Sequence, residues 1–285
     1  MLRLAPLIEE GISLNRFLAR KAPIVVTNGQ DWRLGLKGKK IGLRGVLGVG
    51  KTEFGKEVGD VMKDGPVEYV FREEFVTEDS LSLFYTNIPK YAHQFQTLMM
   101  ERCKWRYAVA EEAAKQGVLS VCDRLPEDNW IFHSQHVTAG NIILEQHNAY
   151  RSEYKAQLPY AADATIHFRA TPEETLNRVH LRGRNSEKNM TVEYLDENDR
   201  AHLMFTFGML GAGHKNISLY NWQDLEAIPS AEEVLRDCIA RMDDPERYKY
   251  VYRARNGINW LSTATTQERT VAFETLCTRH ELIMD

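Results

Sequence analysis

Apolar residues form short continuous runs that alternate with longer segments in which they recur every three or four positions. The runs are typical of buried strands and fall at 40–44, 66–72, 118–122, 164–168 and 217–220. The longer segments are typical of helices and fall at 52–62, 89–115, a long stretch ending near 158, a segment from 172, and 230–242. This alternation predicts an α/β fold, a parallel sheet of about five strands with helices on both faces.

The helix that follows the fourth run has a clear start. Thr171 can cap it, Pro172 suits its first position, and Glu174 would complete a capping box. Gly183 breaks the helical pattern, so we expect this helix to end there. Residues 243–285 are rich in Arg and Tyr and show no pattern that assigns them an element.

The segment GVLGVGKT, residues 45–52, has the G-x-x-x-x-G-K-[ST] spacing of a phosphate-binding loop. Its glycines let consecutive N–H groups point at one anion, and the next helix adds its positive N-terminal end. An ordinary glycine-rich turn is the alternative, but the strand before the loop and the helix after it disfavour that interpretation. The loop predicts a nucleoside triphosphate site made by Gly45, Gly48, Val49, Gly50, Lys51 and Thr52.

Asp123 and Arg124 follow the third apolar run, at the edge where ligands gather in open α/β sheets. The Asp123 carboxylate could hold Mg²⁺ together with the hydroxyl of Thr52, while Lys51 neutralises the β- and γ-phosphates. Arg124 could fix a phosphate or the acceptor oxygen. The alternative for this pair is a surface salt bridge at a strand end.

Three arginines cluster at the end of the helix that begins at 172. Arg178 and Arg182 are four residues apart and share a helix face, and Arg184 lies just beyond Gly183. Like charges this close repel one another unless an anion lies among them, and phosphoryl transfer needs such cations. A solvated basic helix end is the alternative, which the phosphate-binding loop makes less attractive.

Two weaker signals concern the acceptor. Glu73 ends the strand 66–72, where a carboxylate could accept the proton of an attacking hydroxyl, although strand-end glutamates are usually just solvated. In the helix 89–115, one mostly apolar stripe carries a single amide, which could read a nucleobase edge, while core packing is the plainer interpretation. The stripe consists of Gln96, Met99, Met100 and Cys103.

Composition narrows the classes of function. The 285 residues are 43% hydrophobic with a net charge of −4, which fits one large domain and argues against a nucleic-acid-coating surface or a polybasic membrane patch. No apolar run is long enough to span a membrane, and the N-terminus shows no signal-peptide pattern. Four widely spaced cysteines without a C-x-x-C pair favour buried thiols in an intracellular, cytoplasmic setting.

Taken in order, these segments resemble the deoxyribonucleoside kinase family, which includes deoxycytidine, deoxyguanosine and herpesvirus-type thymidine kinases. The stretch ATPEETLNRVHLRGRNSE, residues 170–187, followed by EYL at 193–195, resembles that family's lid helix and arginine-rich lid. Tyr85 and the pair Phe95-Gln96, spaced around Pro89, resemble its sugar- and base-binding segment. The resemblance covers about 39–240, so we expect a P-loop kinase domain at 39–242 with extensions at 1–38 and 243–285.

The resemblance implies a role for each matching residue. Glu73 would be the catalytic base, although Glu74 stands where the family has proline, which leaves the register open by one. Gln96 would read the base, and Tyr85 with Glu187 would grip the 3′-hydroxyl of the sugar. The Asp-Arg pair at 123–124 replaces the family's Glu-Arg. The lid arginines would bind phosphates, and adenine would lie near Gln223, Asp224 and Leu225.

Two departures bear on the substrate. Deoxycytidine-preferring members carry an arginine where this chain has the neutral Cys103, and the segment 123–132 is one residue short, which puts the base-facing position of Asp128 in doubt. A smaller, less polar pocket would favour thymidine or broad pyrimidine use.

The expected activity is therefore ATP- and Mg²⁺-dependent phosphorylation of a deoxynucleoside 5′-hydroxyl, with small-molecule partners and a possible homodimer. One alternative is a monophosphate kinase of the thymidylate kinase type, which must also bind the phosphate of its acceptor. Another is a catalytically silent kinase-shaped subunit of a larger assembly, since fold alone does not imply function.

Overall fold

The structure is a computed structural model that describes residues 30–157, 162–212, 214, 216–223, 228–244, 251–254, 264–279 and 281–284. Its centre is a parallel sheet in the order β2-β3-β1-β4-β5. The strands are β1 (Lys40–Arg44), β2 (Tyr69–Arg72), β3 (Leu119–Asp123), β4 (Ala164–Arg169) and β5 (Ile217–Asn221). The predicted five-stranded parallel sheet is confirmed, with β2 starting later than the apolar run suggested.

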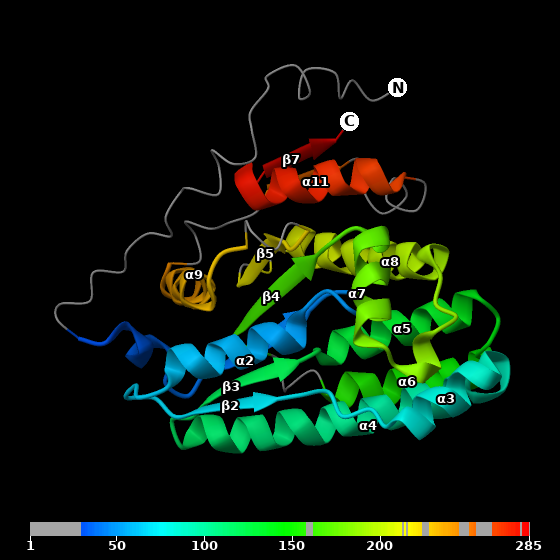
Figure 1. Cartoon of the computed structure of the whole chain (residues 1–285), viewed down its shortest axis with the longest axis horizontal. Coiled ribbons are helices and arrows are strands. Elements are labelled where there is room, and N and C mark those ends of the chain that lie inside the picture. Colours follow the sequence, from blue (N-terminus) through cyan, green and yellow to red (C-terminus); the bar gives the residue numbers. More distant parts are fainter. Residues whose placement is uncertain are drawn as a thin grey trace.

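Helices surround this sheet (Figure 1). They are α2 (Lys51–Met62), α3 (Glu78–Thr86), α4 (Ile88–Lys115), α5 (Pro126–Thr138), α6 (Leu144–Gln157), α7 (Pro172–Arg182), α8 (Val192–Gly211), α9 (Ala231–Asp243) and α11 (Thr266–Arg279). Short 3₁₀ helices lie at η2 (Trp32–Leu36) and η4 (Asn185–Glu187), and a small parallel sheet pairs β6 (Val251–Ala254) with β7 (Glu281–Met284). The predicted single helical stretch up to 158 is two helices, because the chain turns between them at Gly140, whose φ is 73°.

The strand order places the phosphate-binding loop at the centre of the sheet. β1 pairs with β3 on one side and with β4 on the other, so the chain reverses its direction of winding beside the end of β1. Ligands bind at such switch points in open α/β sheets. Leu43 is level with Asp123, so Asp123 leaves β3 next to the loop that follows β1.

One face of the sheet is apolar. Ile41 and Leu43 of β1 join Ile166 and Phe168 of β4 in a cluster that α2 covers with Phe54 and α9 covers with residues such as Leu235. The same cluster includes Leu36 of η2 and Trp222, which follows β5. Burial of these side chains supplies the main hydrophobic stabilisation of the sheet.

The opposite face carries buried polar residues, because strand side chains alternate in direction. Arg44 Nε donates to Asp128 Oδ1 of α5 at 2.9 Å, and both side chains are fully buried. Arg169 makes two 2.9 Å hydrogen bonds to the Asp199 carboxylate of α8. His167 Nδ1 lies 2.8 Å from Thr206 Oγ1, also on α8. These paired groups fix α5 and α8 against the sheet.

The start of α7 follows the prediction in part. Thr171 Oγ1 accepts a hydrogen bond from the Glu174 backbone N–H, so Thr171 is the N-cap. The Glu174 carboxylate, however, accepts from Arg178 Nε at 2.8 Å instead of completing a capping box. The i, i+4 ion pair therefore takes the side chain that the capping box needed.

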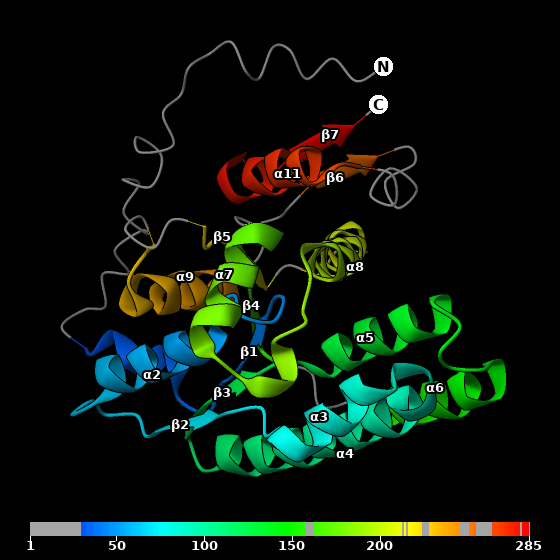
Figure 2. The same cartoon turned by 45° about the vertical axis from the view of Figure 1, so that its right-hand side comes forward.

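The segment that the sequence left unassigned adds a helix to the edge of the fold. Ala272 and Phe273 of α11 pack in a cluster with Phe207 of α8 and Leu219 of β5. Figures 1 and 2 show α11 and β7 beyond β5, at the opposite end of the molecule from α4. Of the extension expected at 1–38, residues 1–29 lie outside the described part of the chain.

The cysteine side chains and the polarity of the helices bear on two further predictions. Cys103, Cys122 and Cys238 are free and buried, as expected for structural thiols, and the side chain of Cys277 lies outside the described part. Each helix in the described ranges is too short or too polar to cross a bilayer.

Candidate active site

The loop after β1 has the backbone of an anion cradle. Gly45 has φ 138°, and a Cβ there would lie 2.3 Å from the Phe168 carbonyl oxygen, so this position requires glycine. Gly50 has φ 108° and is the N-cap of α2, whose first free N–H groups point into the loop. The conformation supports the predicted interaction with phosphate.

Lys51 lies buried under this loop. Its Nζ donates to the carbonyl oxygens of Gly45 and Val46, at 2.9 Å each. Burial, with the nearby positive charge of Arg124, lowers the pKa of Lys51 to about 8. The ammonium is therefore poorly compensated in the free protein, and a phosphate anion would stabilise it.

Thr52 and Asp123 meet beside the loop, as expected. Thr52 Oγ1 donates to Asp123 Oδ2 at 2.9 Å. Asp123 is almost fully buried, and its Oδ1 has no hydrogen-bond partner among the described residues. A buried carboxylate oxygen without a partner beside a hydroxyl fits Mg²⁺, which prefers oxygen ligands and binds through one or two protein groups.

Arg124 pairs with Glu74, the neighbour of the expected base. Arg124 Nε donates to Glu74 Oε2 at 2.6 Å, and its guanidinium stacks over Phe132 at 4.7 Å. Arg124 has φ 71°, a left-handed conformation that turns the chain sharply after β3. Burial acts to lower the pKa of its guanidinium, but the negative charges of Glu74 and Asp123 outweigh this effect and raise that pKa above the ordinary value.

Glu73 occupies a different place from the one predicted. Its side chain is exposed and lines a separate pocket on the outer side of the chain. Glu74 is half-buried and lines the cavity next to the phosphate-binding loop. Adjacent residues of an extended segment point to opposite sides, so the one-residue ambiguity in the sequence is resolved in favour of Glu74 as the carboxylate in this cavity.

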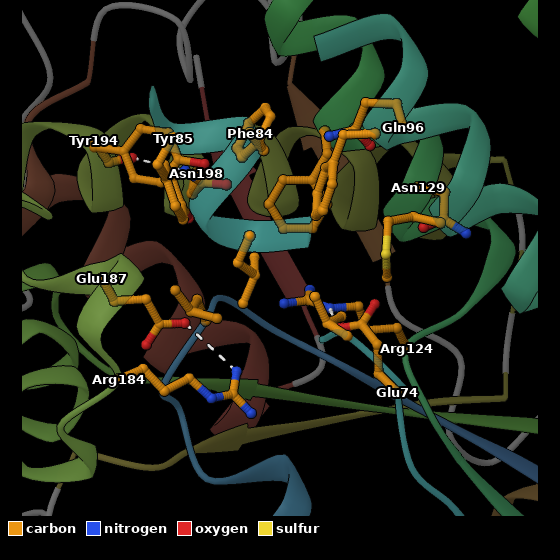
Figure 3. A pocket seen from close by; sticks show the side chains of 16 residues that line it. Glu74, Phe84, Tyr85, Gln96, Arg124, Asn129, Arg184, Glu187, Tyr194 and Asn198 are labelled. Carbon is orange, nitrogen blue, oxygen red and sulfur yellow. Dashed lines mark hydrogen bonds and ion pairs between the residues drawn. The ribbon is translucent and has the colours of Figure 1, made fainter. Parts of the chain in front are cut away.

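A cavity of about 70 Å³ lies between the P-loop, α4 and the connection from α7 to α8. Tyr85, Gln96 and Met99 line it, as the sequence predicted (Figure 3). Arg184 and Glu187 lie across the pocket from Gln96 and Asn129. Further lining residues are Leu47, Glu74, Val76, Leu81, Phe84, Phe95, Arg124, Phe132, Tyr194 and Asn198.

Aromatic rings make up much of the cavity wall. Phe84 of α3 and Phe95 of α4 stack with centroids 4.5 Å apart and an interplanar angle of 17°. Tyr85 is hydrogen-bonded through its hydroxyl to Tyr194 of α8, and burial raises the pKa of Tyr85 well above 10. These flat surfaces can enclose a planar ring, with the Gln96 amide at its edge.

Three residues expected in the nucleoside site lie elsewhere. Met100 is buried in α4 outside the cavity, and Cys103 packs with Tyr107 and Cys122 where α4 covers β3. Asp128 is held by Arg44 and also accepts from the Leu125 backbone N–H at 3.1 Å. Gln96 and Met99 of the same stripe line the cavity, whereas Met100 and Cys103 do not.

Asn129 takes the place expected of Asp128. It lines the cavity and is nearly fully buried, while its Nδ2 has no hydrogen-bond partner within the described ranges. The one-residue shortening of 123–132 was the only signal in the sequence, because it shifts which side chain faces the cavity. A buried primary amide whose N–H groups have no acceptor is costly unless a ligand supplies one.

The connection between α7 and α8, residues 183–191, is called the lid here and lies over the cavity. Glu187 is buried and accepts from Arg182 at 2.6 Å, and it lies 3.5 Å from Arg184. The Ser186 backbone N–H donates to the Glu78 carboxylate of α3 at 2.7 Å. Two of the predicted phosphate-binding arginines are therefore held by the predicted sugar-binding carboxylate.

Arg178 clamps the phosphate-binding loop. Its guanidinium donates to the carbonyls of Val49 at 3.2 Å, Trp222 at 2.8 Å and Gln223 at 3.3 Å. The Gln223 side chain accepts from the Thr171 backbone N–H at 2.7 Å and ties the ends of β4 and β5 together. In this state Arg178 positions the loop. Asp224 and Leu225, expected near adenine, lie outside the described residues.

Comparison with known proteins identifies the family. A family model described as deoxynucleoside kinase matches residues 41–231, more than half of the chain and all five strands except the start of β1. The chain belongs to the deoxynucleoside kinase family.

Relatives in this family differ in the nucleoside for which they are named. The chain is 27% identical over 195 residues to a deoxyguanosine kinase of Dictyostelium discoideum and 27% identical over 207 residues to a deoxycytidine kinase of Bos taurus. These matches cover 65% and 62% of this chain, and 65% and 77% of the relatives. A deoxyadenosine kinase of the same Dictyostelium species is 27% identical over 169 residues, which cover 59% of this chain and 66% of that protein.

A solved structure shares the fold. The deoxyadenosine kinase from M. mycoides with bound dCTP superimposes with a TM-score of 0.57 at 16% identity, covering 70% of this chain and 99% of that one. The family model ends at residue 231, so α9 beyond its first residue and the segment that follows it lie outside that match.

The buried Lys51 makes stability depend on pH. A pKa that falls from 10.5 to about 8 on folding destabilises the folded state below pH 8 by an amount on the order of 3 kcal/mol, and this penalty disappears as the pH rises toward 10.5. We expect the unfolding free energy of the wild type to rise by about 2 kcal/mol relative to Lys51→Met between pH 7 and pH 10. Urea denaturation of both proteins measures this difference, and parallel pH profiles would contradict it.

Proposed function

We propose that this chain is an ATP-dependent deoxyribonucleoside 5′-kinase. The observation that carries the proposal is the Glu74–Arg124 pair, which lies between the P-loop and a cavity walled by Tyr85 and Gln96. That arrangement puts a carboxylate and a guanidinium where an acceptor hydroxyl would meet a triphosphate. Membership of the deoxynucleoside kinase family supports the same reaction.

Glu74, in place of Glu73, would accept the proton of the 5′-hydroxyl as its oxygen attacks the γ-phosphate. Arg124 holds the Glu74 carboxylate in position through the 2.6 Å hydrogen bond from its Nε. Lys51 would neutralise charge on the phosphates, and Arg182 and Arg184 would join it once they release Glu187. Mg²⁺, when held by Thr52 and Asp123, would supply further neutralisation of the phosphate oxygens.

The cavity must widen before a nucleoside enters. Its volume of about 70 Å³ is less than the roughly 150 Å³ that accepts benzene in an engineered protein cavity. The ion pairs of Glu187 with Arg182 and Arg184 and the contact of Ser186 with Glu78 close the lid. A sugar hydroxyl that hydrogen-bonds to Glu187 would replace these arginines and free them for phosphate, so acceptor binding would prepare the donor site.

The cavity is lined by two neutral amides, Gln96 and Asn129, and by the stacked rings of Phe84 and Phe95. Paired amide donors and acceptors suit the hydrogen-bonding edge of a base. The small cavity supports a single-ring base, as in thymidine or a broad pyrimidine specificity, since a purine needs more widening. The position of Cys103 in the core does not contribute to this preference.

A panel of acceptors tests the activity. We expect ATP consumption with deoxynucleosides, fastest with pyrimidines, and little with their 5′-monophosphates, because the two guanidinium groups that line the cavity, those of Arg124 and Arg184, are already paired with Glu74 and Glu187. Lys51→Ala should reduce turnover by at least about 100-fold through lost charge stabilisation. Turnover only with monophosphates would indicate the thymidylate-kinase-like alternative. Turnover only with purine deoxynucleosides would refute the pyrimidine preference. Inactivity with all acceptors would favour the catalytically silent subunit.

Substituting each of the two neighbouring glutamates in turn identifies the catalytic base. Glu74→Gln should lower kcat by about 10²- to 10⁴-fold, because it removes the proton acceptor. Glu73→Gln, an exposed position on the other side of the same segment, should stay within about threefold of wild type. Circular dichroism and nucleoside binding verify that both variants fold. The opposite ranking would return the role to Glu73.

Asn129 should determine how tightly the base is bound. Asn129→Leu keeps the approximate size of the side chain but removes its hydrogen-bonding groups, so the KM for the preferred nucleoside should rise about 10- to 100-fold. The KM for ATP should be unchanged, because Asn129 belongs to α5 and not to the phosphate-binding loop. Steady-state kinetics with each substrate varied in turn measures both values. Equal KM values for the nucleoside in variant and wild type would remove Asn129 from base recognition.

A further inference from the structure

A second pocket lies on the outer side of the segment that carries both glutamates. Glu73 and Phe75 face it, whereas Glu74 between them faces the catalytic cavity. Its floor is the end of β2 and its wall is the middle of α4, which run side by side in both Figure 1 and Figure 2. The pocket has a volume of about 250 Å³, more than the roughly 150 Å³ that holds a benzene ring.

Three arginines converge on this pocket from two elements: Arg72 of β2 and Arg102 and Arg106 of α4. Glu73 is the single carboxylate among the lining residues, all of which lie in the described part of the chain. Arg72 Nε donates to Ser120 Oγ at 3.1 Å, and Arg102 donates to the Phe75 carbonyl at 2.9 Å. Since these bonds use neutral acceptors, the pocket keeps an excess of positive charge.

Arg106 is the deepest of the three. It is 5% exposed, and its Nε has no hydrogen-bond partner in the part of the chain that the structure describes. Burying a guanidinium donor without an acceptor is costly, so an anion in the pocket would repay that cost. Arg106 also interacts electrostatically with Glu74 and therefore connects this pocket to the catalytic cavity.

Two aromatic rings stand at the rim. Phe75 is 67% exposed and Trp105 is 71% exposed, which is unusual for side chains of this size. The Arg102 guanidinium lies over the Phe75 ring at 5.1 Å. Exposed rings beside a basic cluster are a combination suited to a ligand that has both a planar ring and a phosphate.

We propose that the outer pocket, lined by Phe71, Arg72, Glu73, Phe75, Arg102, Trp105 and Arg106, binds a nucleotide. The phosphate would contact the arginines, and the base would stack on Trp105 or Phe75. This site is separate from the catalytic cavity and does not depend on the proposed activity.

Titration calorimetry on the full chain tests the proposal with two probes, thymidine 5′-monophosphate and ATP. A Lys51→Ala background weakens triphosphate binding at the P-loop, so that ATP in the outer pocket can be measured. We expect at least one probe to bind at a site that Arg102→Gln/Trp105→Leu weakens by about 10-fold or more, through the lost charge-assisted hydrogen bond and stacking. The probe whose affinity falls in the double variant is the kind of nucleotide that the outer pocket binds.

Lys104→Gln is the matched control, since Lys104 is an exposed cation on the same helix that does not line the pocket. It should leave both affinities within about twofold. In the wild-type background, the double variant should keep the basal turnover measured at low nucleotide concentration. If circular dichroism shows that the double variant does not fold, Arg102→Gln alone replaces it in these measurements.

Four results would overturn the proposal. Equal affinities in wild type and double variant would show that the pocket is not occupied by either probe. Equal weakening by Lys104→Gln would show a general charge effect. A change of oligomeric state in sedimentation, with nucleotide binding unaltered, would assign the exposed rings to contacts between protein chains. Inorganic phosphate binding as tightly as both nucleotides would refute the stacking of a base.

Discussion

Positive charge at the carboxyl edge of the sheet is the constraint on which the site depends. Each of the cations there is held by oxygen atoms of the protein itself: Lys51 by loop carbonyls, Arg124 by Glu74, Arg178 by Glu174 and three carbonyls, and Arg182 and Arg184 by Glu187. These contacts keep like charges together without a substrate, at the cost of a closed cavity. A triphosphate and a sugar would exchange partners with them, so we expect substrate binding to be coupled to the opening of the cavity.

Local pattern was sufficient to predict the sheet and most of its helices. Five apolar runs became five parallel strands, because a strand buried on one or both faces leaves a clear signal over a few residues. The P-loop followed from glycine positions whose backbone angles no other residue adopts easily, as at Gly45 and Gly50. The helices α3, α8 and α11 were not predicted. In α11, Phe273 is buried by contacts with α8, β4 and β5, which lie far away in the sequence.

The site was harder to predict, because it depends on which way single side chains point. Glu73 and Glu74 have the same side chain, and only the path of the chain after β2 decides which of them pairs with Arg124. Cys103 shares a helical stripe with Gln96, but α4 is long enough that its later turns cover β3 instead of the cavity. Residues spaced three or four apart lie on the same face of a helix. In a long helix, one part of that face can line a pocket while another part packs into the core.

The buried Arg44–Asp128 pair explains why Asn129 lies in the cavity. Asp128 is at the third position of α5, where it also accepts from the Leu125 backbone N–H, and Arg44 fixes its direction from the sheet side. Successive residues of a helix differ in direction by about 100°, so a residue held against β1 turns its neighbour toward the cavity. Removing one partner of such a pair leaves a buried charge uncompensated, at a cost of about 3–5 kcal/mol. The identity of the base-facing residue is therefore set by an ion pair 84 residues apart in the sequence, which no local motif contains.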